Sequence, residues 1–401
     1  MEQYNFDVVY KRTNSEKWME LDRKFGASDL LSFWEADMDF QSPKPVVDAL
    51  VKRAAEGIYG YPHKPGSYNE AVRGWFSRRH GWQFPEEWMC YTPLLMTAVA
   101  IYIREATELG DGVILQTPIY YPFYDVVANT GRKVVRNPMK LVEGRYEMDF
   151  DDLEKKIKEG AKLLVLCNPH NPGGRVWTRT ELERAGELCV KYGVRVIADE
   201  AHGDFTWGDN KYTPFASLSP AFAENAMTLL SPGKTFNVAG TQQAVILIGD
   251  GKMRTRFQKQ TGILDIDRNN CFSMVAVEAA YRYGEDWFDQ VRAYIEANMD
   301  FAAAFCQERI PGIKAAKPEG TYLIWMDCRG LGMTGKELNR FMVEEAKVGF
   351  GEGMWFGPEG EGFERCTAAC PRTILKEGLE RVAQAVNRPR QKTAGLSSGA
   401  K

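Results

Sequence analysis

This chain of 401 residues lacks the features that mark several large classes of protein. No segment approaches the roughly 20 consecutive apolar residues that a membrane-spanning helix needs. Lysine and arginine (51 residues) nearly balance aspartate and glutamate (54), so the net charge of −3 offers no basic surface for nucleic acid or an anionic membrane. We therefore expect neither nucleic acid nor a membrane among its partners.

Metal-binding and redox motifs are also scarce. The chain has four histidines and eight scattered cysteines, and the closest cysteine pair, Cys366 and Cys370, has neither zinc-ribbon nor redox spacing. This pattern predicts no metal site and favours free thiols in a reducing compartment. The first residues show neither the basic start nor the apolar run of a signal peptide, so we expect a cytoplasmic protein.

Short apolar, β-branched segments alternate with longer amphipathic ones through the middle of the chain. This alternation predicts an α/β fold with a mostly parallel sheet. A helix is expected over residues 180–192, because Thr180 and Glu183 have capping-box spacing. The predicted buried strands are residues 113–116, 133–136, 163–166, 194–198, 227–230 and 244–248.

The pattern changes from about residue 275, where long helices surround two strand candidates, 313–315 and 322–325. This change indicates a second, smaller α+β unit, as the length of the chain also favours. We expect a large domain over 49–285, a small domain over 286–387 to which 1–48 contributes, and a disordered polar tail over 388–401. The glycine-rich stretch 351–362 fits a mobile loop better than a nucleotide-binding fingerprint.

Three predicted strands are followed by residues that can carry chemistry. Asn171 follows the strand that ends at Cys167, Asp199 follows Ala198, and Lys234 follows the strand that ends at Leu230. Because ligands of open α/β sheets collect at the carboxyl ends of the strands, we expect an amide, a carboxylate and an amine at one edge.

These are the groups that pyridoxal 5′-phosphate (PLP) chemistry requires. A lysine forms a Schiff base with the cofactor and moves the Cα proton, and a carboxylate keeps the pyridine nitrogen protonated. An amide can bond the phenolic oxygen, and an aromatic ring can stack on the cofactor face, for which Tyr120 and Tyr121 stand just beyond a further strand end. Each residue alone is more often structural, as a surface lysine, a helix-capping aspartate or an Asn-Pro turn, but their order favours PLP.

Longer motifs extend this pattern over most of the chain. They are Trp34-Glu35-Ala36-Asp37-Met38-Asp39-Phe40, Tyr59-Gly60-Tyr61, Thr117-Pro118-Ile119-Tyr120-Tyr121, Asn168-Pro169-His170-Asn171-Pro172, Lys234-Thr235-Phe236-Asn237, and Arg365 ahead of Cys370-Pro371-Arg372. From about residue 7 to residue 381 the chain resembles fold-type I PLP-dependent enzymes of aminotransferase class I/II, specifically the MalY- and PatB-like cystathionine β-lyase (C–S lyase) branch. The resemblance implies a large domain with a mostly parallel seven-stranded sheet and a smaller α+β domain.

The resemblance also implies a role for each motif residue. Lys234 would hold PLP, Asp199 would face its pyridine nitrogen, Asn171 its phenolic oxygen, Tyr121 would stack on its ring and His202 would lie beside it.

The phosphate and the substrate have further implied partners. Ser231 and the helix start at Leu95, Met96 and Thr97 would bind the phosphate. Arg365 would hold the substrate α-carboxylate, near Ala36. Tyr61 would reach the phosphate of a neighbouring subunit, which implies a homodimer with shared active sites.

Some positions depart from the family pattern. Leu94-Leu95-Met96-Thr97 replaces a glycine-containing phosphate loop, and Gly233 stands where a hydroxyl is usual before the lysine. Glu35 replaces an aliphatic residue, so it is either a carboxylate near the substrate or a solvated residue at the rim.

The function that these observations favour is α,β-elimination by a carbon–sulfur β-lyase. Cystathionine or a related S-substituted L-cysteine would yield pyruvate, ammonia and a thiol. An aminotransferase uses the same early steps, and a PLP-binding regulatory protein with weak activity is a third possibility. The branch-specific motifs favour the lyase.

Overall fold

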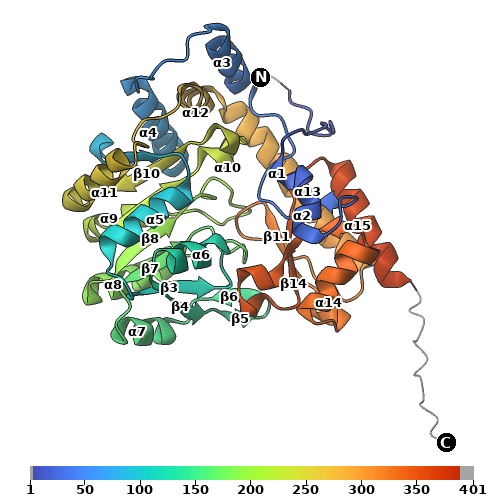
Figure 1. Cartoon of the computed structure of the whole chain (residues 1–401). Helices are drawn as coiled ribbons and strands as arrows, with labels where there is room; N and C mark the ends of the chain where they lie inside the picture. The colour runs from blue at the N-terminus through green and yellow to red at the C-terminus, as the bar shows by residue number, and fades with distance from the viewer. Residues whose placement is uncertain (1–2, 389–401) are drawn as a thin grey trace, which may run out of the picture.

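The computed structural model describes residues 3–388, in which a seven-stranded sheet forms the larger part of the molecule (Figure 1). Its strand order is β2-β10-β9-β8-β7-β3-β4. Every pairing is parallel except those of β10, which runs antiparallel to both neighbours. The predicted α/β fold with a mostly parallel sheet is confirmed. The strands are β2 (Met89–Thr92), β3 (Gly112–Thr117), β4 (Lys133–Pro138), β7 (Leu163–Cys167), β8 (Arg195–Asp199), β9 (Ala226–Leu230) and β10 (Ala244–Ile248).

Helices cover both faces of this sheet, and the alternation of side chains along the strands explains why. In β3, Val113 and Leu115 pack into one apolar cluster, while Ile114 between them packs into another on the opposite face. Strands buried on both faces therefore read as continuous apolar runs. The helices here are α3 (Lys44–Ala55), α4 (Gly66–His80), α5 (Leu95–Ala106), α6 (Pro122–Asn129), α7 (Phe150–Lys158), α8 (Arg179–Tyr192), α9 (Pro220–Asn225), α10 (Pro232–Phe236), α11 (Gly251–Ile263) and α12 (Cys271–Tyr283).

The capping residue predicted for α8 was wrong. Thr178, not Thr180, caps the helix: its hydroxyl accepts from the Glu181 N–H at 3.2 Å, and the Glu181 carboxylate accepts from the Thr178 N–H at 2.8 Å. Both pairs have the same spacing in the sequence. Glu181 also forms an ion pair with the buried Arg175 at 3.1 Å, whereas Glu183 pairs with the exposed Arg179. The contact with Arg175 favours a helix capped by Thr178.

The smaller part is built on a three-stranded antiparallel sheet, β11-β14-β13. The strand predicted at 322–325 is β11, but residues 313–315 form only an isolated bridge, Lys314 to Asp327. The elements are β11 (Leu323–Asp327), β13 (Gly351–Glu352), β14 (Phe363–Thr367), α13 (Glu285–Arg309), α14 (Gly335–Arg340) and α15 (Arg372–Asn387). A separate hairpin joins β5 (Lys140–Val142) to β6 (Arg145–Glu147).

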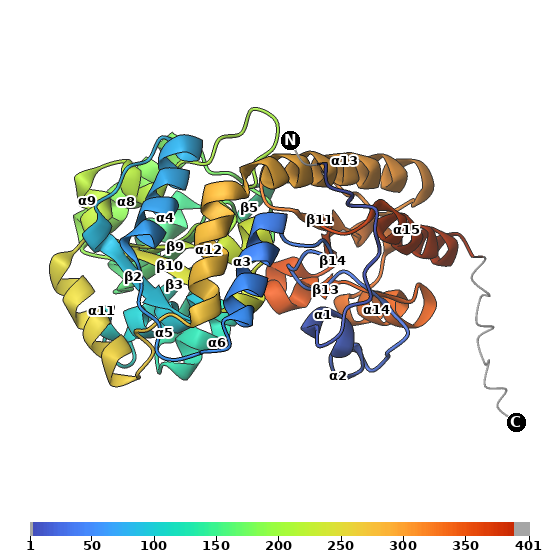
Figure 2. The same cartoon turned by 90° about the horizontal axis from the view of Figure 1, so that it is seen from above.

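The N-terminal segment packs on this smaller part. α1 (Glu16–Met19) and α2 (Leu21–Phe25) lie beside the C-terminal elements in both views (Figures 1 and 2). β1 (Leu31–Ser32) pairs in parallel with β12 (Val348–Gly349). The domain boundaries at 48 and 285 stay predictions, and the tail predicted over 388–401 lies, apart from Arg388, outside the described residues.

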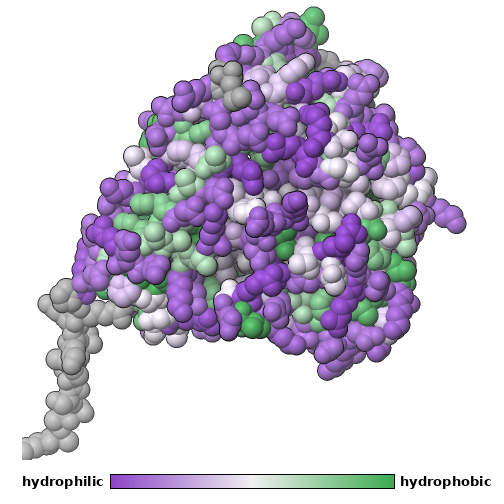
Figure 3. Space-filling model, turned by 180° about the vertical axis from the view of Figure 1, so that it is seen from behind, coloured by the Kyte–Doolittle hydropathy of each residue, from purple (hydrophilic) through white to green (hydrophobic). Residues whose placement is uncertain are grey.

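No helix within residues 3–388 combines the length and apolar composition needed to cross a bilayer. On the face drawn in Figure 3, hydrophobic residues stand in separate groups among hydrophilic ones.

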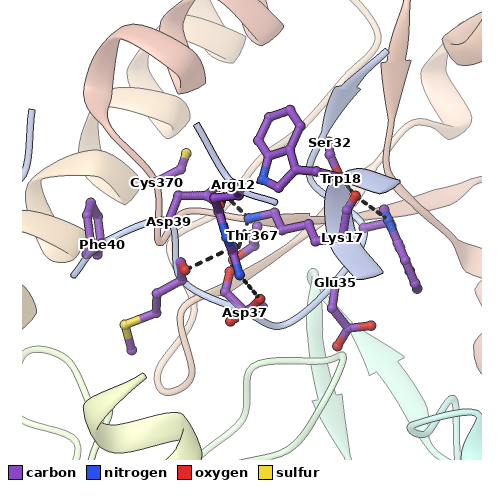
Figure 4. Close-up of polar contacts among 12 residues, drawn as sticks. Arg12, Lys17, Trp18, Ser32, Glu35, Asp37, Asp39, Phe40, Thr367 and Cys370 are labelled. Carbon is purple, nitrogen blue, oxygen red and sulfur yellow. Dashed lines mark hydrogen bonds and ion pairs between the residues drawn. The ribbon is translucent and has the colours of Figure 1, made fainter. Parts of the chain in front are cut away.

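A buried ion-pair network fixes the chain just before α3 (Figure 4). The ammonium of Lys17, whose side chain is 0% exposed, lies 2.7 Å from Asp39. Arg12 binds Asp39 at 2.8 Å and Asp37 at 2.6 Å, and the Trp18 indole N–H donates to Asp39 at 2.9 Å. Two cations thus balance two carboxylates; Lys17 and Asp39 are buried, whereas Arg12 and Asp37 are 24% and 27% exposed.

The same network positions the residues before Asp37. The Lys17 carbonyl accepts from the Ser32 hydroxyl at 2.6 Å and from the Trp34 indole N–H at 3.1 Å. Residues 32–39 are therefore held at both ends, and the backbone between them has little freedom.

Replacing Lys17 should destabilise the protein strongly. Lys17→Met keeps the apolar stem but leaves Asp39 short of one buried cation, so we expect a loss of about 3 kcal/mol in the free energy of unfolding. Urea titration followed by tryptophan fluorescence measures it. Arg179→Met, which removes an exposed partner of Glu183, is the matched control and should change stability little. Equal effects of the two variants would contradict the role of the network.

The difference between wild type and Lys17→Met should also depend on pH. Burial acts to raise the pKa of Asp39, but Lys17, Trp18 and Arg12 outweigh burial and hold the pKa below its ordinary value. A carboxyl with a lowered pKa stabilises the fold above its unfolded pKa, about 4. That contribution disappears as pH falls through the folded pKa, so the two proteins should converge in acid.

Candidate active site

The central strands bring the predicted amide, carboxylate and amine to one edge of the sheet. β7, β8 and β9 are consecutive neighbours and parallel, so their carboxyl ends coincide. Asn171 follows β7, Asp199 ends β8, and Lys234 lies in α10 directly after β9.

The Lys234 amine meets a carbonyl of the N-terminal segment. Its Nζ donates to the Ala36 oxygen at 2.6 Å, and the Tyr322 hydroxyl donates to the same oxygen at 3.1 Å. Ser231 caps α10, where its hydroxyl oxygen accepts from the Lys234 N–H at 3.3 Å. The amine is therefore held beside Ala36 rather than in bulk solvent, and the Ser231 proton is left to donate elsewhere.

Asp199 is a buried carboxylate with weak partners. It accepts from the Ala201 N–H at 3.3 Å and from the Cys167 thiol at 3.5 Å, and no ion pair joins it to any described residue. Burial raises its pKa, and the Ala201 hydrogen bond opposes that shift. A buried carboxylate in this state favours a cationic partner, as a pyridinium would be.

Arg365 is the matching buried cation. One terminal nitrogen donates to the Asn171 side-chain oxygen at 3.1 Å and the other to the Trp34 carbonyl at 2.5 Å, while Nε is buried without a partner. The guanidinium also lies 4.8 Å from the Phe356 ring centroid. Burial lowers its pKa. No carboxylate of the described chain neutralises this fork by direct contact, so the site fits a ligand carboxylate.

His202 lies nearby in neutral form. Its Nδ1 is buried with no hydrogen-bond partner, and its ring meets Tyr322 edge-on at 5.3 Å. Burial, together with the charges of Lys234 and Arg365, lowers the pKa of His202 well below its ordinary value. An unpartnered nitrogen buried in this way indicates a place for a ligand atom.

The phosphate-binding residues predicted at Leu95, Met96 and Thr97 form the first turn of α5. Leu94 precedes this turn, and no side chain caps it. The first N–H groups of such a helix have no partner within the helix, and they attract anions. The missing glycine of the family pattern has not prevented this helix start.

Tyr121 stands among aromatic side chains that sequence analysis missed. Its ring lies 5.8 Å from Trp355 and 5.9 Å from Phe356, both edge-on, and the Lys24 ammonium is 5.1 Å from its centroid. Burial, and secondarily Glu35, raises the pKa of Tyr121 to about 12, so its hydroxyl stays protonated at neutral pH.

Trp355 and Phe356 come from the stretch interpreted as a mobile loop, and that interpretation was wrong. The stretch forms β13, η6 (Gly353–Phe356) and η7 (Pro358–Gly360). The backbones of Gly353 and Gly360 approach so closely that a Cβ on either would lie 2.0 Å from the other's carbonyl oxygen. These glycines allow the two backbones to pack closely. The pair of aromatic residues inside a glycine-rich stretch was the sequence signal that could have identified Trp355 and Phe356.

Two predicted residues need separate mention. Glu35 is partly buried, and its carboxylate accepts from the Ala36 N–H at 3.0 Å. Figure 4 shows its side chain pointing away from the ion-pair network of Lys17. Tyr61 is 90% exposed, with the Arg268 guanidinium 5.0 Å from its ring. It makes no contact with Lys234 or Asp199 of its own chain, so its predicted role for a neighbouring subunit stays a prediction.

Together these residues fit PLP. They offer an amine at Lys234, an unpaired buried carboxylate at Asp199, an unpartnered nitrogen at His202 and an open helix start at Leu95. Arg365 remains for a substrate carboxylate.

Comparison with known proteins agrees with this fit. The profile of the family "Aminotransferase class I and II" matches residues 28–382. Cystathionine beta-lyase PatB of Bacillus subtilis is 41% identical over 386 residues, which cover 96% of this chain and all of that protein. Protein MalY of Escherichia coli is 32% identical, with 96% and 99% covered.

Solved structures lead to the same group. The PLP-bound C-S lyase from Staphylococcus hominis superposes with a TM-score of 0.90 at 30% identity, and covers 96% of this chain and 99% of that one. Cystalysin from Treponema denticola, which contains PLP, gives a TM-score of 0.92 at 33% identity with the same coverage.

The site predicts where the cofactor attaches. Borohydride reduction of the PLP-loaded protein, followed by peptide mass mapping, should place the pyridoxyl group on Lys234. Lys234→Ala should lose the label, whereas Lys252→Ala, which removes an exposed lysine, should keep it. A pyridoxyl group on another lysine of the wild-type protein would overturn the assignment.

Proposed function

We propose that this chain, which belongs to the aminotransferase class I and II family, is a PLP-dependent carbon–sulfur β-lyase of cystathionine or related S-substituted L-cysteines. The reaction removes the Cα proton and breaks the Cβ–S bond. A thiol leaves, and the remaining three-carbon fragment hydrolyses to pyruvate and ammonia. The observation that carries the proposal is the full-length similarity to cystathionine beta-lyase PatB.

Lys234 and Asp199 are the residues suited to proton transfer and charge stabilisation. PLP, when bound, supplies an electron sink for the pair left at Cα. The Lys234 amine, once released from the Ala36 carbonyl, can take the proton from Cα and later return it. The buried Asp199 carboxylate can hold a proton on the pyridine nitrogen.

Arg365 and its partners orient the substrate. Asn171 and the Trp34 carbonyl fix the guanidinium fork, and its unpartnered Nε remains for the α-carboxylate. Holding that carboxylate aims the Cα–H bond toward the amine, and orientation of this kind supplies much of a catalytic rate. His202 stays neutral, so it adds no charge that would compete for the carboxylate.

An assay of products tests the proposal. Protein loaded with PLP should release pyruvate and thiol in equal amounts from L-cystathionine. Asp199→Asn should keep the pyridoxyl label on Lys234 but lose about a hundredfold or more in kcat, because a neutral amide cannot hold the pyridinium proton. A change in KM alone would mean that Asp199 has another role.

The same assay separates the second candidate function. Aminotransferases also need a lysine, a carboxylate and a guanidinium in these positions, and the matched family is named for them. Formation of a keto acid that keeps the thioether, without pyruvate, would replace the lyase proposal with an aminotransferase.

We further propose a homodimer with shared active sites that works in the cytoplasm. Ile58 (78%), Tyr59 (56%) and Tyr61 (90%) form an exposed apolar run just before α4, a feature that favours an interface. All eight cysteines are free thiols, the state that a reducing compartment maintains; cell fractionation tests the compartment.

Mixing two inactive variants tests the shared sites. Tyr61→Ala and Lys234→Ala, unfolded and refolded together, should recover about a quarter of wild-type activity, because half of the dimers regain one intact site. Lys234→Ala mixed with Asp199→Asn is the control: both residues belong to one subunit's site, so activity should stay low. Equal results from the two mixtures, or a monomeric mass near 45.4 kDa, would contradict the proposal.

A further inference from the structure

A second buried carboxylate lies in the loop after β8 and takes no part in the chemistry proposed above. The side chain of Asp204 is only 6% exposed. One of its oxygens accepts from the Trp75 indole N–H at 2.9 Å and from Nε2 of His80 at 2.7 Å, both on α4. The other oxygen accepts from the Thr235 hydroxyl at 2.5 Å. A buried carboxylate with three donors is held firmly, because moving it would break several hydrogen bonds at once.

Asp204 is held as an anion. Burial acts to raise its pKa, but His80, and after it Thr235 and Trp75, outweigh burial and hold the pKa below its ordinary value. Hydrogen bonds to an ionised acceptor are stronger than those between neutral groups. The hydroxyl of Thr235 is therefore bound more tightly than it would be by a carbonyl oxygen.

Thr235 connects this carboxylate to the helix that carries Lys234. The two residues are consecutive in α10, and consecutive side chains of a helix point about 100° apart. Thr235 therefore faces Asp204 while Lys234 extends elsewhere. Among residues 3–388, the contact of Thr235 with Asp204 is the one side-chain hydrogen bond that joins the loop 200–206 to α10.

The strands fix this part of the site only as far as their ends. β8 and β9 pair as far as Asp199 with Leu229, and the Glu200 N–H donates to the Leu229 oxygen at 3.1 Å. Within the described part of the chain, no backbone hydrogen bond joins the following loop to α10. A rigid aromatic ring that meets both Asp199 and Lys234 binds well only if the separation of these two residues is fixed. The bond between Asp204 and α10 supplies that constraint.

We propose that Asp204 and Thr235 are positioning residues, which fix Lys234 relative to Asp199 so that both meet the same cofactor ring. Neither of them hydrogen-bonds to the Lys234 amine or to the Asp199 carboxylate in the described structure, so they act through α10 and through the loop. This inference rests on the proposed function, which assigns the cofactor to Lys234 and Asp199. It deepens that function by naming what aligns the two residues.

Variants of Thr235 test the assignment through the affinity for PLP. Thr235→Val keeps the branched shape but removes the hydroxyl, so titration of the PLP-free full chain should show a dissociation constant about tenfold higher. Thr235→Ser keeps the hydroxyl and should stay within about twofold of wild type. Thr261→Val is the matched control. Thr261 is equally buried, and its hydroxyl donates to the Gln258 carbonyl of its own helix, α11, at 2.9 Å, so its loss should leave PLP binding unchanged.

The visible circular dichroism of bound PLP reports the alignment itself. PLP is achiral, so its absorption band becomes dichroic only when the protein holds the ring in one orientation. With every protein saturated, Thr235→Val should show about twofold less dichroism per bound cofactor, while Thr235→Ser and Thr261→Val keep the wild-type signal. If Thr235→Val lowered the Tm of the PLP-free chain but left affinity and dichroism unchanged, Thr235 would merely support the fold, and the proposal would fail.

A double-mutant cycle tests whether the two residues act through one hydrogen bond. Asp204→Asn removes the charge that strengthens this bond, so it should weaken PLP binding at least as much as Thr235→Val does. In the double variant, the loss of affinity should be smaller than the product of the two single losses. Losses that simply multiply would show that Asp204 and Thr235 act separately, which contradicts the proposal. Should Asp204→Asn fail to fold, the threonine variants still decide the question.

These measurements keep this inference separate from the lyase proposal. Absence of pyruvate from every thioether would reject the lyase but leave the PLP affinities and the dichroism to stand. Unchanged affinity and dichroism in Thr235→Val would reject the positioning role even in an active lyase.

Discussion

The buried ion pair between Lys17 and Asp39, reinforced by Arg12, is the constraint on which the active site depends. It holds residues 32–39 of the N-terminal segment across the edge of a sheet formed by distant residues. From that segment the Ala36 carbonyl meets the Lys234 amine, and the Trp34 carbonyl meets the Arg365 guanidinium. The positions of Lys234 and Arg365 are therefore tied to an ion pair on the smaller part, Lys17 with Asp39, that solvent screens little.

Buried charges within the site differ from a buried charge outside it in whether they form ion pairs. Arg175, equally buried, is paired with Glu181 at 3.1 Å and with Glu319 at 2.9 Å. Asp199 and Arg365 have no such ion pairs. Leaving buried charges unpaired lowers stability, and the proposed function assigns the missing partners to a cofactor and a substrate. Local departures from good pairing are expected at functional sites.

Lys234, Asp199 and Arg365 stand on or next to the strands of the two sheets, where their positions are rigid. Lys24 belongs instead to the N-terminal segment and lines the groove beside Trp355.

The sequence by itself determined the sheet and the inner site. Runs such as 113–116 are typical of buried strands, and neighbouring parallel strands bring Asn171, Asp199 and Lys234 to one edge of the sheet. The start of α8 was predicted wrongly at Thr180, because Thr178 offers the same spacing and the contact of Glu181 with Arg175 favours Thr178. Tertiary structure alone decided which rings surround the Lys24 ammonium, those of Trp34, Tyr121 and Trp355. The helix α2 and the turn η6 are some 330 residues apart in the chain, and no local pattern records such a contact.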